Sequence, residues 1–399
     1  MKELRALRKS THEQSSPERA KYERDTNRSR AIKLMFGNIY NGKKVLVTGN
    51  TGFKGSWLTV WLKELGADVY GLSISVPTKP ALFEVAALEK EIKHHSIDIR
   101  DREKTVACIE KIQPDFIFHM AAQPIVATSY SDPVGTIATY AMGTVHVLEG
   151  VRTLKNRCHV ILITSDKCYE NVEWIFGYRE TDRLGGKDIY SASKAAAEIL
   201  IYSYYHSFIR HLPNSRMASV RAGNVIGGGD WAEKRLVPDC IRAWVKNQPV
   251  VIRNPQSTRP WQHVLEPLSG YLVTGEHLAK NDSLNGESFN FGPAADQIFA
   301  VKQMLEAIGK DWSFTKKHAL YKVEGSPGFH EAGLLKLNCD KAHTYLHWKP
   351  VLDFPQTARM TASWYGAYYG DEKDMASFTR NQISQYVEAA KENNLAWIQ

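Results

Sequence analysis

Alternation between short apolar strands and amphipathic helices is the feature that most constrains how this chain can fold. The first unit runs from KVLVT (44–48) through the glycine-rich turn GNTGFKG (49–55) into the helical pattern SWLTVWLKELG (56–66). Further strands are expected at 68–75, 94–101, 115–123, 159–165, 217–227 and 288–292, with helices at 104–112, 133–154 and 190–211. Strands that alternate with helices at this spacing predict an α/β fold, a Rossmann-like doubly wound parallel sheet.

The predicted sheet accounts for only part of the 399 residues. We expect it to occupy residues 36–227 and to be completed by a return at about 263–292. Residues 228–262 and 293–365 contain more Pro, Trp and Arg, and we assign them to a second, smaller, mostly helical substrate-binding domain. Residues 366–399 are expected to form a C-terminal helical segment.

The formal charge of +8 lies mainly at the N-terminus. Residues 1–34 contain ten Lys/Arg, five Asp/Glu and few large apolar side chains, which predicts a disordered basic tail. Because the remainder is nearly neutral, the charge gives no indication of nucleic-acid binding. No apolar run approaches the roughly 18 residues of a membrane span, and no signal-peptide core is visible. The five cysteines are widely spaced. We therefore expect a cytoplasmic protein that holds no metal and binds neither nucleic acid nor membrane.

The glycines of the first turn are placed where a dinucleotide would bind. Gly49, Gly52 and Gly55 separate the first strand from the first helix, so a pyrophosphate could approach the backbone and the helix N-terminus. The spacing also fits a tight turn that binds nothing. Asp98-Ile99 at the end of one later strand and HMAAQ (119–123) at the end of the next favour the dinucleotide site.

The choice between NAD and NADP depends on the end of the second strand. An acidic residue there usually marks NAD and an arginine NADP, but GLSIS (71–75) contains neither. Ser73 or Ser75 could hydrogen-bond a ribose hydroxyl, whereas Lys79 could meet a 2′-phosphate. We expect NAD.

Two segments contain groups suited to proton transfer. YSASK (190–194) places Tyr190 and Lys194 on one helix face, where the ammonium would lower the tyrosine pKa and favour a phenolate base. Taken alone, this pattern is usually a surface pair. The strand end TSDKCY (164–169) adds two hydroxyls, a carboxylate, an ammonium and a phenol, which indicates either a dense cap or a proton-transfer site.

These motifs resemble those of the nucleotide-sugar 4,6-dehydratases, in the extended short-chain dehydrogenase/reductase family. The similar stretches are VTGNTGFKGSWL, TSDKCYEN, YSASKAAAE, RAGNVIGGGDW, RLVPDCIRA and RPWQHVLEPLSGYL, within about residues 36–360. The resemblance implies NAD as cofactor. The implied cofactor-binding residues are Gly49, Thr51, Gly52, Phe53, Gly55, Ser73, Asp98, Ile99, Ala121, Ala122, Gln123, Thr164, Tyr190 and Lys194.

The resemblance also implies an internal redox cycle on a nucleotide-bound sugar, CDP-glucose. The products would be a 4-keto-6-deoxy sugar and water, used in dideoxysugar and O-antigen synthesis. The implied catalytic residues are Ser165, Asp166, Lys167, Tyr190 and Lys194. Asp166 occupies the acid position, and Lys167 stands where related enzymes carry a glutamate base.

The implied substrate-binding residues are Asn224, Arg235, Arg259, His330 and Glu331. For His330 and Glu331, and for Trp231 and Trp261, a packing role is equally open. Four positions depart from the family pattern: Tyr140 replaces an asparagine, Ala127 a basic residue, Ile189 a proline and Lys234 an acidic residue.

Three alternatives remain open. A nucleotide-sugar 4-epimerase would need Tyr190 and Lys194 but not the Asp166–Lys167 pair, which could instead be a structural ion pair beside a reductase site. A non-catalytic NAD-sensing protein could share the fold. Apolar positions on the helices at 133–154 and 190–211 predict a homodimer or homotetramer.

Overall fold

The centre of the computed structural model is a seven-stranded sheet in which all neighbouring strands are parallel. The structure describes residues 32–312, 319–325, 334–370 and 372–398. The strands are β1 (Lys44–Thr48), β2 (Asp68–Ser73), β3 (Lys93–Ser96), β4 (Phe116–His119), β5 (Cys158–Ile163), β6 (Ser215–Ala222) and β11 (Ser288–Phe291). The predicted doubly wound parallel sheet is confirmed.

The strand order, β11-β6-β5-β4-β1-β2-β3, reverses direction at β1. The chain first builds outward from β1 to β3 and then returns to place β4 on the other side of β1. Ligands of such sheets bind beyond the carboxyl ends of the strands at this reversal. The topology therefore puts the loops after β1 and β4 at the expected binding crevice.

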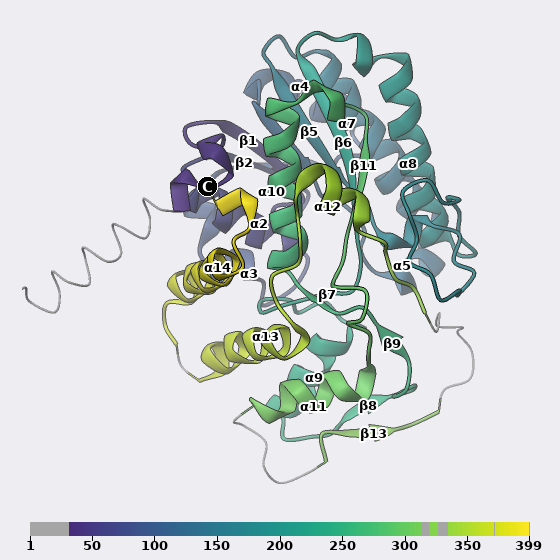
Figure 1. Cartoon of the computed structure of the whole chain (residues 1–399), viewed down its shortest axis with the longest axis vertical. Coiled ribbons are helices and arrows are strands. Elements are labelled where there is room, and N and C mark those ends of the chain that lie inside the picture. Colours follow the sequence, from purple (N-terminus) through teal and green to yellow (C-terminus); the bar gives the residue numbers. More distant parts are fainter. Residues whose placement is uncertain (1–31, 313–318, 326–333, 371, 399) are drawn as a thin grey trace, which may run out of the picture.

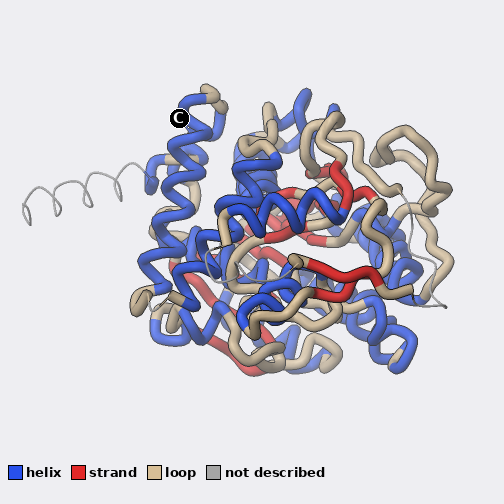
Figure 2. Tube along the Cα trace, turned by 90° about the horizontal axis from the view of Figure 1, so that it is seen from below, coloured by secondary structure: helices blue, strands red, loops and turns tan. Residues whose placement is uncertain are grey.

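Helices cover both faces of the sheet (Figures 1 and 2). On one face α4 (Arg102–Ile112), α7 (Gly143–Arg152) and α8 (Ile189–Ser207) enclose a core that contains Leu46 and Ile117. On the other face α2 (Phe53–Glu64) and α10 (Leu265–Lys280) enclose a core that contains Val45, Val47 and Phe118, and α14 (Met375–Glu392) packs on α2. Side chains of a strand point alternately to the two faces of the sheet. Because helices cover both faces, the side chains on both must be apolar, and this is why the strands read as continuous apolar runs.

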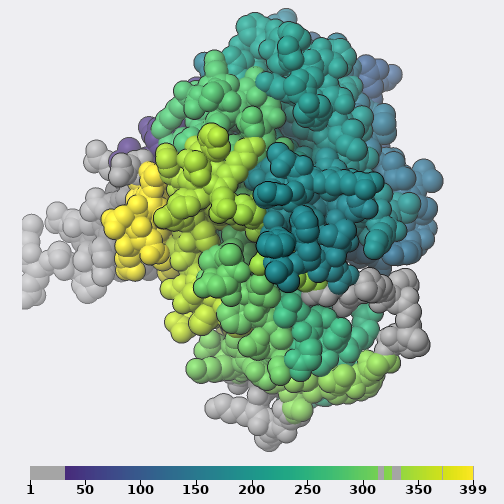
Figure 3. All heavy atoms as spheres, turned by 45° about the vertical axis from the view of Figure 1, so that its right-hand side comes forward, coloured from purple at the N-terminus to yellow at the C-terminus, as the bar shows by residue number. Residues whose placement is uncertain are grey.

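A second lobe lies below the sheet in Figure 1 and forms the lower green part of Figure 3. It contains α9 (Leu236–Val245), α11 (Val301–Lys310) and two small sheets. These sheets pair β8 (Val250–Ile252) with β13 (Tyr321–Val323) and β9 (Thr258–Arg259) with β12 (Phe299–Ala300). α13 (Phe354–Tyr369) joins it to α14. α12 (Asp340–Leu346), inside the range expected for the substrate domain, packs on β11 and α10 instead.

The remaining elements are short. They are β7 (Val225–Ile226), β10 (Gln262–His263), α3 (Leu82–Val85), α5 (Val126–Ser131), α6 (Pro133–Ile137), the π-helical turn η4 (Ala138–Met142), and the 3₁₀ turns η2 (Phe36–Asn38), η3 (Leu88–Lys90), η5 (Asp166–Cys168), η6 (Ile209–His211), η7 (Asp282–Leu284) and η8 (Ala396–Ile398). At the end of the predicted tail, Ile32 is buried in the core, and residues 1–31 lie outside the described chain.

Most strands end earlier than the sequence predicts, and the difference is largest for three of them, of which the segment expected at 217–227 ends at Ala222. The segment 94–101 is extended only to Ser96, because the Asp98 carboxylate accepts a hydrogen bond from the Arg100 N–H and turns the chain. The segment 115–123 ends at His119. Among the described residues, no helix combines the length and apolar character needed to cross a bilayer.

Candidate active site

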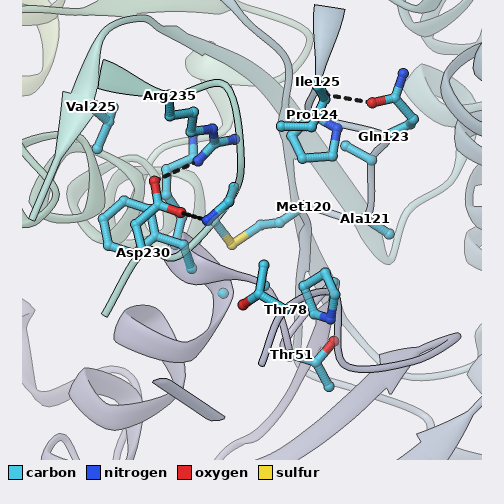
Figure 4. A pocket seen from close by; sticks show the side chains of 18 of the residues that line it. Thr51, Thr78, Met120, Ala121, Gln123, Pro124, Ile125, Val225, Asp230 and Arg235 are labelled. Atoms are coloured by element: carbon cyan, nitrogen blue, oxygen red, sulfur yellow. Dashed lines mark hydrogen bonds and ion pairs between the residues drawn. The ribbon is translucent and has the colours of Figure 1, made fainter. Parts of the chain in front are cut away.

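A cleft of about 1190 Å³ lies at the carboxyl ends of the strands, bounded by the sheet and by the loop that leads into the second lobe. Figure 4 shows it from close by, with Thr51 of the first turn across the cleft from Gln123 and its neighbours after β4 and from Arg235, which directly precedes α9. The structure brings most of the predicted site residues together here. Those that line the cleft are Gly49, Thr51, Gly52, Phe53, Gly55, Ser73, Asp98, Ile99, Ala121, Ala122, Gln123, Thr164, Ser165, Asp166, Lys167, Tyr190, Lys194, Asn224 and Arg235.

Three predicted substrate residues are not among them. Arg259 lies on β9, outside the residues that line the cleft, and its guanidinium donates to the Thr258 carbonyl at 2.7 Å. His330 and Glu331 lie outside the described residues.

Gly55 and Gly52 of the first turn have different surroundings, so glycine is needed at the two positions for different reasons. A Cβ on Gly55 would lie 2.1 Å from the Gly49 carbonyl oxygen, so the turn itself excludes a side chain there. A Cβ on Gly52 would meet only that same oxygen, at an ordinary 3.4 Å. α2 begins at Phe53, and its N-cap residue Gly52 offers no side-chain cap, so the first N–H groups of the helix depend on another acceptor. A pyrophosphate approaching Gly52 fits both observations.

Ser73 is turned towards this loop. Its hydroxyl donates to the Asn50 side-chain oxygen at 2.8 Å and accepts from the Thr51 N–H at 3.4 Å. Asp98 is paired with Arg100 at 2.6 Å, which lowers the pKa of the Asp98 carboxyl. Ser73 therefore helps to hold the glycine-rich turn (49–55) in its conformation. The charges of Asp98 and Arg100 largely neutralise each other.

The segment after β5 is anchored at both ends by buried polar groups. Thr164 donates to Glu198, which forms an ion pair with Arg221 at 2.8 Å, and both charged side chains are almost fully buried. Arg221 in turn donates to the Tyr169 hydroxyl at 2.6 Å, and Tyr169 donates to Asn290. The intervening residues 165–168 are thus held in place from both sides.

Between these anchors, Asp166 and Lys167 have different surroundings. The Ser165 hydroxyl donates to the buried Asp166 carboxylate at 2.8 Å, and that carboxylate packs so closely on Gly223 that a Cβ there would lie 2.0 Å away. Lys167 is half-buried and lines the cleft. In the part of the chain that the structure describes, its ammonium forms no ion pair. The structural Asp166–Lys167 pair that the sequence left open is therefore not formed.

Tyr190 and Lys194 both lie buried on the first turns of α8. The Lys194 Nζ is 3.6 Å from the centre of the Tyr140 ring but 6.0 Å from that of Tyr190. Tyr140 was visible in the sequence only as a departure from the family pattern. Its ring, rather than that of Tyr190, makes the closer contact with the ammonium.

Burial controls the ionisation of this pair. It raises the pKa of Tyr190, while a hydrogen bond with Tyr140 and the charge of Arg235 act in the opposite direction. Burial and the neighbouring Lys54 ammonium lower the pKa of Lys194 well below its usual range. The predicted lowering of the tyrosine pKa is therefore wrong as a net effect, because burial of the phenol outweighs the polar groups around it and the ammonium lies closer to the other ring.

Lys54 is a residue that the sequence reasoning missed. It lies inside the glycine turn, lines the cleft and donates to the Tyr271 hydroxyl at 3.3 Å. Burial and the charge of Arg235 lower its pKa to about 8. The signal in the sequence was a charged residue between the second and third glycines of the turn.

At the other end of the cleft, Arg235 is held by Asp230 at 2.9 Å (Figure 4). Trp231 packs against the aromatic rings of α13 and also lines the cleft, so both roles considered for it stay open. The buried Trp261 N–H lines the same region and has no hydrogen-bond partner among the described residues. No group of three or more His, Cys, Asp or Glu residues in the described ranges is arranged to hold a metal ion.

Comparisons with known proteins agree with this geometry. Residues 46–361 match the family model described as GDP-mannose 4,6 dehydratase. The chain belongs to this nucleotide-sugar 4,6-dehydratase family. It is 45% identical over 356 residues to the CDP-glucose 4,6-dehydratase of Salmonella typhimurium, a match that covers 88% of this chain and 98% of that protein. A dTDP-glucose 4,6-dehydratase of Haemophilus influenzae is 27% identical, over 80% of this chain and 97% of that one.

Solved structures with the same fold are more distant in sequence. Pal from Bacillus thuringiensis superposes with a TM-score of 0.69 at 23% identity, covering 82% of this chain and 99% of that one. The UDP-glucose 4-epimerase of Thermotoga maritima gives 0.68 at 22% identity, covering 81% and 98%. At these identities the similarity establishes the fold.

Proposed function

We propose that the protein is an NAD-dependent nucleotide-sugar dehydratase that converts CDP-glucose to CDP-4-keto-6-deoxyglucose and water. The observation that supports this most strongly is the convergence of three groups in one cleft: the glycine turn, the Tyr190–Lys194 pair and the Ser165–Asp166–Lys167 segment. The choice of cytidine rests on the similarity to the Salmonella dehydratase that acts on CDP-glucose.

NAD supplies the chemistry of hydride removal at sugar C4 and hydride return at C6. Gly49, Gly52 and the uncapped start of α2 would hold its pyrophosphate. Ser73 at the end of β2, and Ile99 and Ala121 in the loops after β3 and β4, would hold the rest. Solved epimerases of the same fold, from Brucella ovis and Thermus thermophilus, are described in complex with NAD.

Tyr190 acts as the base that takes the proton from the sugar O4 during C4 oxidation. A base of this kind contributes about 10²–10⁴-fold. When it carries a proton, the buried Lys194 opposes the effect of burial on Tyr190 and favours the phenolate as the O4 proton moves. A C4 ketone then acidifies the neighbouring C5–H.

Lys167 and Asp166 carry out the elimination. Lys167, which has no ion-pair partner among the described residues, removes the C5 proton in its neutral form. Asp166, buried on Gly223, donates a proton to the departing C6 hydroxyl. The Ser165 hydroxyl holds the Asp166 carboxyl in position. Removal of one proton at C5 and addition of one at O6 releases water.

The substrate diphosphate would be bound by Arg235 and Asn224, which line the cleft opposite the glycine turn. Arg235 is oriented by Asp230, so its guanidinium can present further N–H groups to a phosphate. Arg259, His330 and Glu331 stay predictions from the family resemblance.

We also infer a cytoplasmic homo-oligomer. Val134 on α6 and Ile199 and Tyr202 on α8 are 76%, 54% and 65% exposed, and the two helices are in contact. These exposed apolar side chains on two contacting helices are suited to pairing with a second copy, as a homodimer or as part of a homotetramer.

The decisive experiment is incubation with NAD and each of CDP-, dTDP- and UDP-glucose and GDP-mannose. The 4-keto product, which absorbs in alkali, should form fastest from CDP-glucose. CDP-glucose deuterated at C4 should give product that carries the label at C6 of the same molecule. An epimerised sugar without a 4-keto product would overturn the proposal in favour of a 4-epimerase, and faster turnover of another donor would overturn the cytidine assignment.

A further inference from the structure

Tyr140 stands at an unusual point of the backbone. It lies in the π-helical turn η4, which joins α6 to α7, and its side chain is only 4% exposed. π-helical turns are rare and occur frequently at functional sites, where they redirect a side chain out of the regular helical register. Here the turn directs Tyr140 into the cleft, beside Tyr190 and Lys194.

The ring of Tyr140 contacts both members of the catalytic pair. The Lys194 ammonium lies 3.6 Å from the ring centre, a close cation–π contact in a buried setting. The Tyr140 and Tyr190 rings meet edge to face at 5.8 Å and 88°. One side chain therefore limits the positions of both proton-transfer groups.

The hydroxyl of Tyr140 has two acceptors within reach. It donates to the Gln123 carbonyl at 3.0 Å, and the Tyr190 hydroxyl lies close enough for hydrogen bonding from Tyr140 to lower the pKa of Tyr190. A hydroxyl has one proton, so the two acceptors compete for it. A phenolate accepts a stronger bond than a carbonyl, because hydrogen bonds to ionised acceptors are about twice as strong as those between neutral groups. Ionisation of Tyr190 should therefore turn the Tyr140 proton towards it.

We propose that Tyr140 is a positioning residue for the proton-transfer pair: its ring face holds the Lys194 ammonium, and its hydroxyl donates to Tyr190 when that phenol ionises. The inference rests on the proposed function, since it needs Tyr190 to act as a base. Tyr140 thereby supplies both an aromatic and a polar contact at a position where the family usually has asparagine.

The pH dependence of turnover tests the role of the hydroxyl. The charged or titratable groups that act on Tyr190 are Tyr140, Arg235, Asp166, Asp188 and, across the Tyr140 ring, Lys194. Tyr140→Phe keeps the ring and removes one donor to the phenolate, leaving the other groups in place. On the acid limb of the profile, where Tyr190 is mostly protonated, kcat/KM of Tyr140→Phe for CDP-glucose should be about tenfold lower than that of the unmodified protein. At high pH, where Tyr190 ionises without help, the rate should return to that of the unmodified protein.

A spectroscopic titration gives a readout that needs no turnover. The tyrosinate absorbance of the unmodified protein minus that of Tyr190→Phe isolates Tyr190 from the other tyrosines. The same difference measured in the Tyr140→Phe background should show ionisation at higher pH. Tyr140→Leu, which also removes the ring, should lower turnover at every pH, because Lys194 loses its contact.

The matched control is Tyr40→Phe. Tyr40 is equally buried, and its hydroxyl also donates to a backbone carbonyl, that of Leu272 at 2.7 Å, but it lies outside the cleft. Its pH profile should equal that of the unmodified protein. A uniform loss of rate in Tyr140→Phe, or an unchanged Tyr190 titration, would overturn the inference while leaving the dehydratase proposal intact. Absence of turnover in the unmodified protein would overturn the proposed function instead.

Discussion

Lys167 is the residue on which the proposed reaction differs most from that of enzymes with a glutamate base. Replacement by methionine keeps the length of the side chain and removes the amine that would take the C5 proton. C4 oxidation should survive, since Tyr190 and Lys194 are unchanged, but elimination should slow by about 10²–10⁴-fold. With CDP-glucose and NAD, the near-ultraviolet absorbance of the reduced nicotinamide should therefore accumulate while the 4-keto-6-deoxy product does not.

The control for this variant is Lys246→Met, a change of the same type at an exposed position after α9. It should form product at the normal rate. If Lys167→Met also did so, Lys167 would not be the base, and the assignment of the elimination step would have to change.

At the scale of elements, we expect alanine to have opposite effects at Gly55 and Gly52 of the first turn: one lowers stability and the other lowers cofactor affinity. Gly55→Ala places a Cβ against the Gly49 carbonyl, so the turn must shift, and we expect a loss of about 1–3 kcal/mol in stability. Gly52→Ala has room within the protein, so its melting temperature should stay unchanged. Its Cβ would instead meet the cofactor, and NAD affinity measured by calorimetry should fall about tenfold or more, some 1.4 kcal/mol. Equal NAD affinity in Gly52→Ala and the unmodified protein would argue against a pyrophosphate at this turn.

Much of the sheet could be predicted from the sequence, because a buried parallel strand must be apolar on both faces and the runs at 44–48 and 159–165 are. The limits of the strands were harder to predict. The Asp98 side chain ends one of them through a bond to the backbone, which no apolar pattern reveals.

The site was predictable where a motif fixes the spacing, as for Tyr190 and Lys194 on one helix. It was not predictable where a side chain reaches across the cleft. Lys54 and Tyr140 come from separate elements, and only the fold places Tyr140 between the two members of the pair. Arg259 shows the converse, since Trp261 of the same motif lines the cleft while Arg259 itself does not.

For the whole molecule, Glu266 connects three segments. Its buried carboxylate accepts from the Val351 and Leu352 N–H groups and from the Tyr386 hydroxyl, so it joins α10 to the segment that precedes α13 and to α14. Burial raises its pKa from 4.5 to about 7, although these donors oppose the shift. The folded protein therefore holds this proton more tightly than the unfolded chain does.

The stabilisation due to Glu266 is thus fully present below the unfolded pKa of 4.5 and is lost as the pH rises through about 7. We expect up to about 3 kcal/mol of such loss between about pH 5 and pH 8. Glu266→Gln can still accept from both N–H groups while Tyr386 donates to Ser269, so it should fold and lack this component. Denaturant unfolding of Glu266→Gln and of the unmodified protein between about pH 5 and pH 8 measures this difference. If the free energy of unfolding changed equally with pH in both proteins, Glu266 would not titrate in this range.

The exposed apolar side chains of α6 and α8 predict the state of assembly. Val134→Asp combined with Tyr202→Asp should reduce the mass measured by light scattering to that of one chain, because two charges cannot be buried unpaired in an interface. Val323→Asp, at a comparably exposed position of the second lobe, should leave the mass unchanged. An oligomer that persists in the double variant would move the interface elsewhere.

The ion pair of Arg221 with Glu198 limits which residues near the active site can be substituted. Loss of either partner would leave an uncompensated buried charge, at a cost of about 3–5 kcal/mol, so these two positions have little freedom to vary. Lys167, a few residues along the same segment, contributes nothing to that network. The scaffold thus separates what must be kept for folding from what can be exchanged for new chemistry. A redesigned base at position 167 could be introduced without re-engineering the protein around it.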